Sequence, residues 1–402
     1  MKPPITILKF ITALSIYFSV QGNCIAQQQP IPFFGDTIWI NPHPSVQVNY
    51  GSSLDQQSIE DFYQQLLSSR YQPILQSLLQ FKEKNKPDDW LYYQLIRRTA
   101  QLLSPKANNY YRYTLYKWFF LTQSGYDAIL TISQQKILFY VRSNEFVYNI
   151  PTRYTNAGNY VCLNYHDYGF VDFTNEKFTQ LKLETPLAKE AFSYKVTQLP
   201  PFLPADYEEK ELRFNYRQND YHFKVKLNQQ VKQLFANYPV VDYNYYFNIP
   251  LSKETYTSLI PALKNHLKKK SKKNGVDFLM RFTRYAFLFE QDSARFGKEK
   301  RMSPEETLNY DYSDCEDRAA LFFYLVKEIY NLPMIVLVYP HHVTIAVQFD
   351  KPIGKIIEYN GKKYTVCEPT PQQQDLKIGQ LLPTLNNASY EVVYVYDPVK
   401  KQ

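Results

Sequence analysis

Apolar residues in this chain of 402 residues repeat with two different periods, and the changes of period divide the chain. Between residues 54 and 131 they recur every three or four positions, which predicts an α-helical segment. From 132 to 249 they alternate, which predicts a β-rich, sandwich-like domain. After residue 250 the helical period returns. The sequence therefore predicts an α+β fold, and 402 residues are enough for two or three domains.

The clearest alternation is a predicted hairpin with one apolar face. Its two halves flank the polar residues 218–220, and its apolar positions are Leu212, Phe214, Tyr216, Tyr221, Phe223, Val225 and Leu227. The proline-rich residues 200–204 predict a loop, because proline removes a backbone donor. Beyond them, residues 253–267 and 275–289 are predicted helices.

A weak internal repeat is also present. Residues 118–141 predict a helix, a Ser-Gly turn and two strands, in the same order as residues 315–347. The earlier copy has no Cys and no His at the matching places. We interpret it as a degenerate repeat.

The N-terminus has the layout of a secretory signal peptide over residues 1–26. Lys2 and Lys9 precede an apolar run over residues 10–20, and the small residue Ala26 follows. We expect cleavage after Ala26 and a secreted or periplasmic protein. Residues 27–53, rich in Pro and Gln, are then expected to form a linker.

Two alternatives at this end concern the membrane. Cys24 suggests a lipoprotein, but the preceding Gly22-Asn23 lacks the small residue that normally adjoins a lipidated cysteine. The apolar run is too short to span a bilayer, and no later window is apolar enough to do so. We therefore expect no integral membrane segment in the mature chain.

Composition and charge narrow the classes of partner. The aromatic share of 17% favours ordered folding. Loss of the two leader lysines lowers the formal net charge from +8 to +6, a mild excess. Six lysines lie within residues 264–273, and we interpret them as a solvated helix end and predict no nucleic-acid partner.

Cysteine and histidine usage argues against a bound metal. Cleavage leaves three cysteines, and an odd count leaves at least one free thiol. There is no C-x-x-C pair, and the six histidines are mostly scattered. We expect no metal and no organic cofactor.

The most informative stretch is residues 312–319. Asp314 is a natural N-cap and Asp317 can complete a capping box, so Cys315 is predicted at the first turn of a buried helix. The helix dipole favours a thiolate there, whereas Glu316 and Asp317 oppose it. A nucleophilic thiol therefore needs an imidazolium partner.

The predicted partner is His342. Residues 334–339 and 342–349 predict two strands, and His342 shares the polar, small-residue face of the second with Thr344, Ala346 and Gln348. We expect that face to admit the Cys-bearing helix end. His341, in the turn, is out of phase.

Glu368 is the predicted third member of the site. Asn360-Gly361 predicts a type I′ turn, and the strand over 362–366 ends beside Glu368, whose carboxylate would orient the imidazole. The Cys315 N–H is the candidate oxyanion donor, and Gln291 is a second candidate unless it is a surface residue. Cys367 is packed in the core or forms a disulfide with Cys315.

These three places resemble the transglutaminase-like superfamily of papain-like fold. They are the helix start at residues 314–319, the strand start at 342–347 and the strand end Glu368-Pro369-Thr370, and the resemblance covers about residues 250–390. It implies a cysteine hydrolase or acyltransferase with a Cys-His-acid triad. The chain departs from the family twice, because Glu368 replaces an Asp and Asp314 stands where many relatives have Gly.

The resemblance leaves two hypotheses. In the first, Cys315 attacks an amide in a protein or peptide substrate, and water or an amine resolves the acyl-enzyme. Peptidase, amidase and cross-linking activity remain open. In the second, the C-terminal domain is an inactive scaffold and the chain binds a protein or glycan partner.

Overall fold

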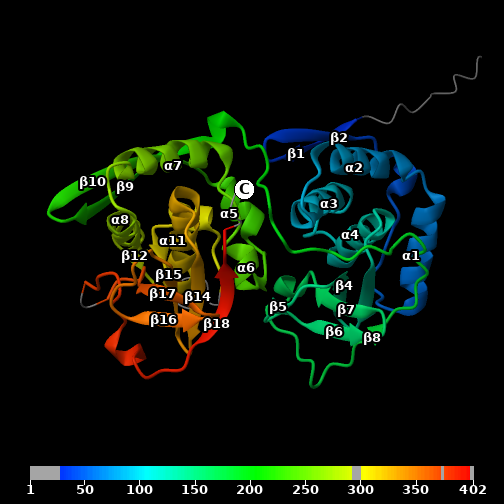
Figure 1. Ribbon diagram of the computed structural model, residues 1–402. Helices are drawn as coiled ribbons and strands as arrows, with labels where there is room; N and C mark the ends of the chain where they lie inside the picture. The colour runs from blue at the N-terminus through cyan, green and yellow to red at the C-terminus, as the bar shows by residue number, and fades with distance from the viewer. Residues whose placement is uncertain (1–27, 292–299, 373–374, 399–402) are drawn as a thin grey trace, which may run out of the picture.

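The computed structural model describes residues 28–291, 300–372 and 375–398 and has a mixed α+β architecture (Figure 1). The chain forms two consecutive units that lie side by side. We call residues 29–198 the first module and residues 207–396 the second module. In each, helices pack on one face of a five-stranded antiparallel sheet.

The first module begins with a two-stranded hairpin and four helices. These are β1 (Gln29–Phe33), β2 (Asp36–Ile40), α1 (Gln56–Ser68), α2 (Gln72–Asn85), α3 (Asp89–Leu103) and α4 (Tyr110–Gln123). The strands that follow are β3 (Ala128–Ile132), β4 (Ile137–Ser143), β5 (Val147–Tyr148), β6 (Thr152–Thr155), β7 (Gly158–Cys162) and β8 (Thr179–Gln180).

The second module also begins with a hairpin, followed by helices and short strands. These are β9 (Tyr207–Tyr216), β10 (Asn219–Asn228), α5 (Gln230–Phe235), β11 (Val240–Val241), α6 (Tyr243–Tyr246), α7 (Lys253–Leu267), α8 (Lys272–Tyr285), β12 (Leu288–Phe289), α10 (Pro304–Asn309), β13 (Tyr312–Ser313) and α11 (Cys315–Tyr330). The sheet contains β14 (Met334–Tyr339), β15 (His342–Val347), β16 (Ile356–Tyr359), β17 (Lys362–Cys367) and β18 (Glu391–Tyr396).

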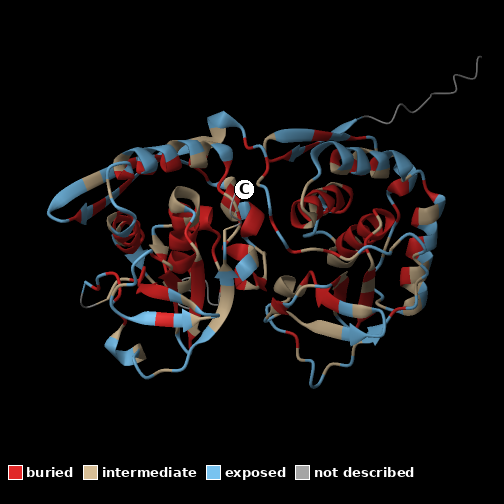
Figure 2. Ribbon diagram, viewed as in Figure 1, coloured by how far each residue is buried: buried red, intermediate tan, exposed pale blue. Residues whose placement is uncertain are grey.

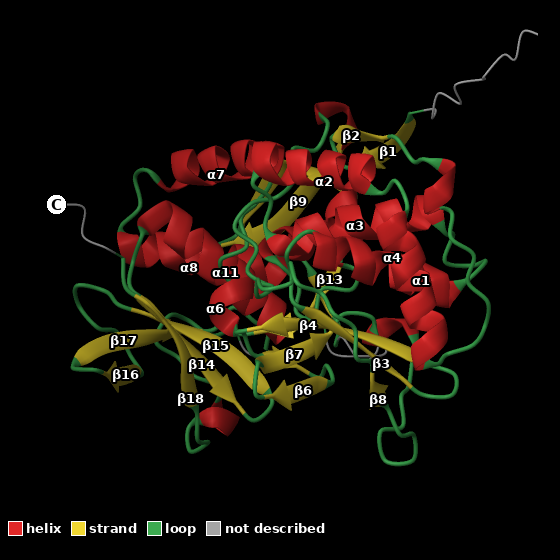
Figure 3. Cartoon of the chain, turned by 90° about the vertical axis from the view of Figure 1, so that its right-hand side faces the viewer, coloured by secondary structure: helices red, strands yellow, loops and turns green. Residues whose placement is uncertain are grey.

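The two five-stranded sheets have the same topology. Their orders are β6-β7-β4-β3-β8 and β16-β17-β15-β14-β18. When the strands of each sheet are numbered in chain order after α4 or after α11, both sheets have the spatial order 3-4-2-1-5. Neighbouring strands are antiparallel throughout. Figure 3 shows the helices above and both sheets below. The internal repeat inferred from the sequence therefore extends over both modules.

A continuous apolar core lies between helices and sheets, where Figure 2 shows buried residues on the facing sides. The modules meet through β5 and β11, which pair over two residues each. The Trp90 indole N–H also donates to the Leu234 carbonyl at 2.8 Å. The contact between the modules is thus partly main-chain pairing and partly core packing.

Two parts of the sequence-based domain plan differ from the structure. Residues 29–40, within the expected linker, form the β1–β2 hairpin. Residues 132–249 do not form a sandwich, because β9 and β10 pair only with each other and pack on α7 and α8 of the second module. The expected signal peptide lies outside the described residues.

Two local predictions are confirmed. The β9–β10 hairpin forms, with its turn at Arg217-Gln218, both of which have positive φ, instead of residues 218–220. Asn360-Gly361 forms the tight turn between β16 and β17. The lysines of residues 264–273 lie at the turn from α7 to α8, mostly exposed.

Helices α8 and α11 approach closely at Gly275. A Cβ there would lie 1.6 Å from the Tyr330 hydroxyl oxygen. We expect Gly275→Ala to lower the free energy of unfolding by about 1–3 kcal/mol, the usual cost of overpacking, measured by urea denaturation. Gly51→Ala is the control, because nothing lies within 4 Å of its Cβ position. Equal stability of Gly275→Ala and the unaltered chain would contradict the close approach.

Candidate active site

Cys315 is the first residue of α11, as predicted. Asp314 caps the helix: its side chain accepts from the Asp317 N–H at 3.3 Å, and the Asp317 carboxylate accepts from the Asp314 N–H at 3.3 Å. Asp317 also accepts from the Met302 N–H. The capping box is therefore confirmed and fixes where the helix begins.

Arg318 anchors this helix start to the preceding segment. Its guanidinium is fully buried and donates to five main-chain carbonyls, those of Thr283, Arg284, Phe287, Leu288 and Ser313. Burial lowers the pKa of Arg318 to about 10, so it stays charged at neutral pH. This anchoring role of Arg318 was not predicted from the sequence.

The Cys315 thiol is half-buried and donates a hydrogen bond to the Glu316 carboxylate, with 2.7 Å between Sγ and Oε2. Burial raises the pKa of the Cys315 thiol far above its ordinary value, and the charges of Glu316 and Asp314 raise it further. A contact with the Val343 main chain acts in the opposite direction. The resting residue is therefore a thiol, because burial and the two carboxylates together raise its pKa in spite of the helix dipole.

His342 and Glu368 are in direct contact. The His342 Nε2 lies 2.7 Å from Glu368 Oε2, and the two side chains are 11% and 0% exposed. The second carboxylate oxygen accepts from the Thr370 N–H at 2.9 Å. The additional methylene of Glu368, relative to Asp, is thus compatible with a bond of normal length.

This contact sets the charge state of the imidazole. Burial alone lowers the pKa of His342, but the hydrogen bond and the charge of Glu368 outweigh it, and Glu316 adds to them, so the pKa is raised. With Nε2 bound to Glu368, Nδ1 has no hydrogen-bond partner among the described residues. Nδ1 is the nitrogen left for proton transfer.

The body of α11 packs on the other face of β15 from the one expected. Val343, Ile345 and Val347 belong to the core that contains the α11 side chains, whereas Ala346, on the His342 face, belongs to a separate core. The thiol reaches the strand at the Val343 main chain. No hydrogen bond joins Cys315 to His342 within the described part of the chain.

The remaining candidates take simpler roles. Cys367 and Cys162 are buried free thiols, so the Cys315–Cys367 disulfide is not formed. His341 and Gln291 are exposed. The Cys315 N–H lies in the first helical turn, which lacks intrahelical acceptors. Across residues 28–291, 300–372 and 375–398, no group of three His, Cys, Asp or Glu is arranged to hold a metal.

Two further residues near the site have roles that the sequence analysis missed. Glu316 was noted only for its charge, but it is the hydrogen-bond acceptor of the thiol. Arg284 is buried and donates to the Glu368 main-chain carbonyl and to Asp375. An arginine in the apolar pattern of α8 was the available signal for a buried structural role.

Within the described residues, none of the helices has the length and apolar character needed to cross a bilayer. Comparisons with protein-family models, with curated proteins and with solved structures find no match to this chain.

Proposed function

We propose that this chain is an exported, transglutaminase-like cysteine hydrolase or acyltransferase that acts on an amide bond of a protein or peptide. The observation that carries the proposal is the His342–Glu368 hydrogen bond of 2.7 Å. The next residue after His342 is Val343, whose main chain the Cys315 sulfur contacts. The chain order of thiol, imidazole and acid, and the thiol at the start of a capped helix, support it further.

In this reaction Cys315 Sγ forms a bond to the carbonyl carbon, and its proton passes to Nδ1 of His342. Glu368 positions the imidazole and stabilises its protonated form. The Cys315 N–H is the proposed donor to the developing oxyanion. The leaving amine takes the proton from His342, and water or a second amine then displaces the thiol. Because Glu316 holds the thiol at rest, Sγ must first turn away from it.

Alkylation of Cys315 by iodoacetamide tests the pairing of thiol and imidazole. His342→Ala is expected to slow labelling about fivefold between pH 6 and 8, because a unit charge at about 4 Å is worth about 1 kcal/mol in water. In the unaltered chain the rate should still rise above pH 9, since the thiol pKa is raised. Rates are measured by mass spectrometry against pH.

His341→Ala is the matched control, because this neighbouring histidine is exposed. Cys315→Ser gives the background from the other thiols, of which Cys162 and Cys367 are buried. If His342→Ala labels as fast as His341→Ala at every pH, the imidazole does not serve the thiol and the proposed hydrolase is wrong.

A second candidate is a non-catalytic scaffold that binds a protein or glycan partner. The specific observation in its favour is that the Cys315 thiol is bound to Glu316 and that the pKa of this thiol is raised. An active nucleophile needs a thiolate instead. The labelling experiment separates the two candidates, because a scaffold has no need of His342.

A further inference from the structure

The repeated topology identifies the places in the first module that correspond to the candidate site. The helix start of Cys315 corresponds to Tyr110, the strand start of His342 to Ile137, and the segment after β17 to that after β7, which contains Asn164. The Asn164 amide donates to the Tyr110 hydroxyl at 2.8 Å and to the Ile137 carbonyl at 2.9 Å. The three corresponding places therefore also meet in space.

The corresponding centre cannot perform the proposed reaction. Tyr110 replaces the nucleophile and donates to Asp167 at 2.9 Å, and Asp167 also binds Lys106 at 2.7 Å. The nearby Cys162 is buried and donates to Asn164. These polar groups satisfy one another, so the first module keeps the architecture without the chemistry.

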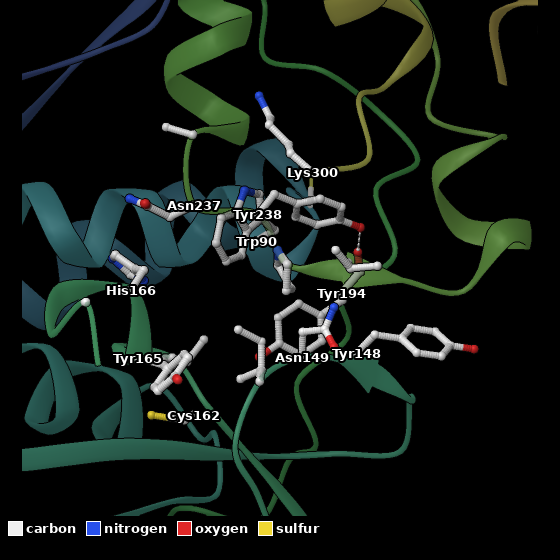
Figure 4. Close-up of a pocket in the computed structure, with 16 residues that line it drawn as sticks. Trp90, Tyr148, Asn149, Cys162, Tyr165, His166, Tyr194, Asn237, Tyr238 and Lys300 are labelled. Atoms are coloured by element: carbon white, nitrogen blue, oxygen red, sulfur yellow. Dashed lines mark hydrogen bonds between the residues drawn. The ribbon is translucent and has the colours of Figure 1, made fainter. Parts of the chain in front are cut away.

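A pocket of about 310 Å³ lies beside this centre (Figure 4). Cys162, the last residue of β7, and His166, from the segment that follows β7, form part of its wall. Aromatic residues form much of the remainder, and Figure 4 shows Trp90, Tyr165, Tyr194 and Tyr238 around the space, whereas the ring of Tyr148 extends away from it. Several are fixed, since Trp90 contacts Tyr238 edge-on at 5.3 Å and the Tyr238 hydroxyl donates to the Tyr194 carbonyl.

The polar groups of the pocket suit an uncharged ligand. Burial lowers the pKa of His166, so it is neutral at pH 7. The Lys300 ammonium binds the Glu306 carboxylate at 2.7 Å. The side-chain amides of Asn149 and Asn237 have no hydrogen-bond partner within the described residues, and each amide offers two donors and an acceptor.

Ring walls with amides between them favour a saccharide ring. The apolar faces of a sugar pack on aromatic rings, and its hydroxyls can pair with the amides. An aromatic side chain would fill the same volume but leave both amides unpaired, which costs binding free energy.

A chain of side-chain contacts leads from the pocket towards the Cys315 thiol. Tyr148 lines the pocket, and the Arg301 guanidinium lies 5.2 Å from its ring and 4.1 Å from the ring of Tyr243. Burial raises the pKa of Tyr243, and the charges of Glu316 and Cys315 also act on it. The residues around the thiol are therefore linked through Arg301 to a residue that lines the pocket.

We propose that the first module is a non-catalytic copy of the second, and that the pocket, which residues of both modules line, binds an uncharged sugar ring of the substrate. Binding of the sugar is independent of the proposed function. Only the delivery of an attached amide to Cys315 rests on it.

The test is binding of the trisaccharide of N-acetylglucosamine to the purified chain by saturation-transfer NMR and calorimetry. We expect binding that Asn237→Ala weakens about tenfold, because two to three hydrogen bonds are lost. Asn244→Ala, an exposed asparagine on α6, and Cys315→Ala should leave the affinity unchanged. Thermal unfolding confirms that each variant is folded.

The proposal is overturned if the trisaccharide does not bind at millimolar concentration, or if Asn237→Ala and Asn244→Ala bind it equally. Binding of N-acetyltyrosinamide in the pocket without the trisaccharide also overturns it in favour of an aromatic side chain. If the trisaccharide binds as expected while His342→Ala leaves Cys315 labelling unchanged, the sugar site stands and the hydrolase fails.

Discussion

Replacing Arg318 with methionine is expected to lower the free energy of unfolding by about 3–5 kcal/mol, because each buried carbonyl left without a donor costs about 1–3 kcal/mol. The variant keeps much of the side-chain volume but leaves five carbonyls without their donor. Two of them, those of Thr283 and Arg284, end α8 and have no intrahelical partner. The loss should appear as a lower urea midpoint.

Arg318→Lys separates charge from geometry. Lysine keeps the charge, but its compact ammonium cannot reach carbonyls on several sides, so we expect intermediate stability. Arg213→Met is the control, because this arginine on β9 is 68% exposed, and we expect a change within about 0.5 kcal/mol. If Arg318→Met is no less stable than Arg213→Met, the buried guanidinium is not what joins α8 to α11.

Replacing Glu316 with glutamine is expected to raise the rate of iodoacetamide labelling of Cys315 about tenfold or more at pH 7.5. Glutamine keeps the size of the side chain but removes the negative charge beside the thiol, so the thiol pKa falls and the thiolate fraction rises. The pKa shift is measured from the pH dependence of the rate. Glu328→Gln, at the far end of the same helix, is the matched control.

The same variant should change the charge preference at the thiol. Glu316 attracts a cationic reagent and repels an anionic one, each by about 1 kcal/mol at about 4 Å, or about fivefold in rate. The ratio of rates for cationic and anionic methanethiosulfonates should therefore fall about 25-fold in Glu316→Gln. An unchanged ratio and an unchanged labelling rate would mean that burial alone raises the pKa.

Local signals in the sequence predicted the parts of the site that local geometry determines. The capping box fixes Cys315 at the helix start because both of its partners lie within one turn. Strand alternation after the Asn360-Gly361 turn placed Glu368 within reach of His342. In both cases the required contacts lie close in sequence or follow from the period of a strand.

Strand partners and side-chain contacts could not be predicted in the same way. Alternation shows that residues 207–228 form strands, but the partner of a strand depends on distant side chains, so the sandwich was wrong. Pro30 and Pro32 concealed the first hairpin, although proline is tolerated in a two-stranded edge ribbon. The bond from Cys315 to Glu316 depends on side-chain rotamers, which a pattern of residues does not specify.

The consecutive arrangement of the modules has a consequence for biogenesis. The sheet of the first module is complete by Gln180, before any residue of the second has been synthesised, and its helices precede that sheet. A chain that emerges from its N-terminus can therefore fold this half first. The β5 edge and the surface around Trp90 are then still without their partners, so the second half assembles against a surface that already exists.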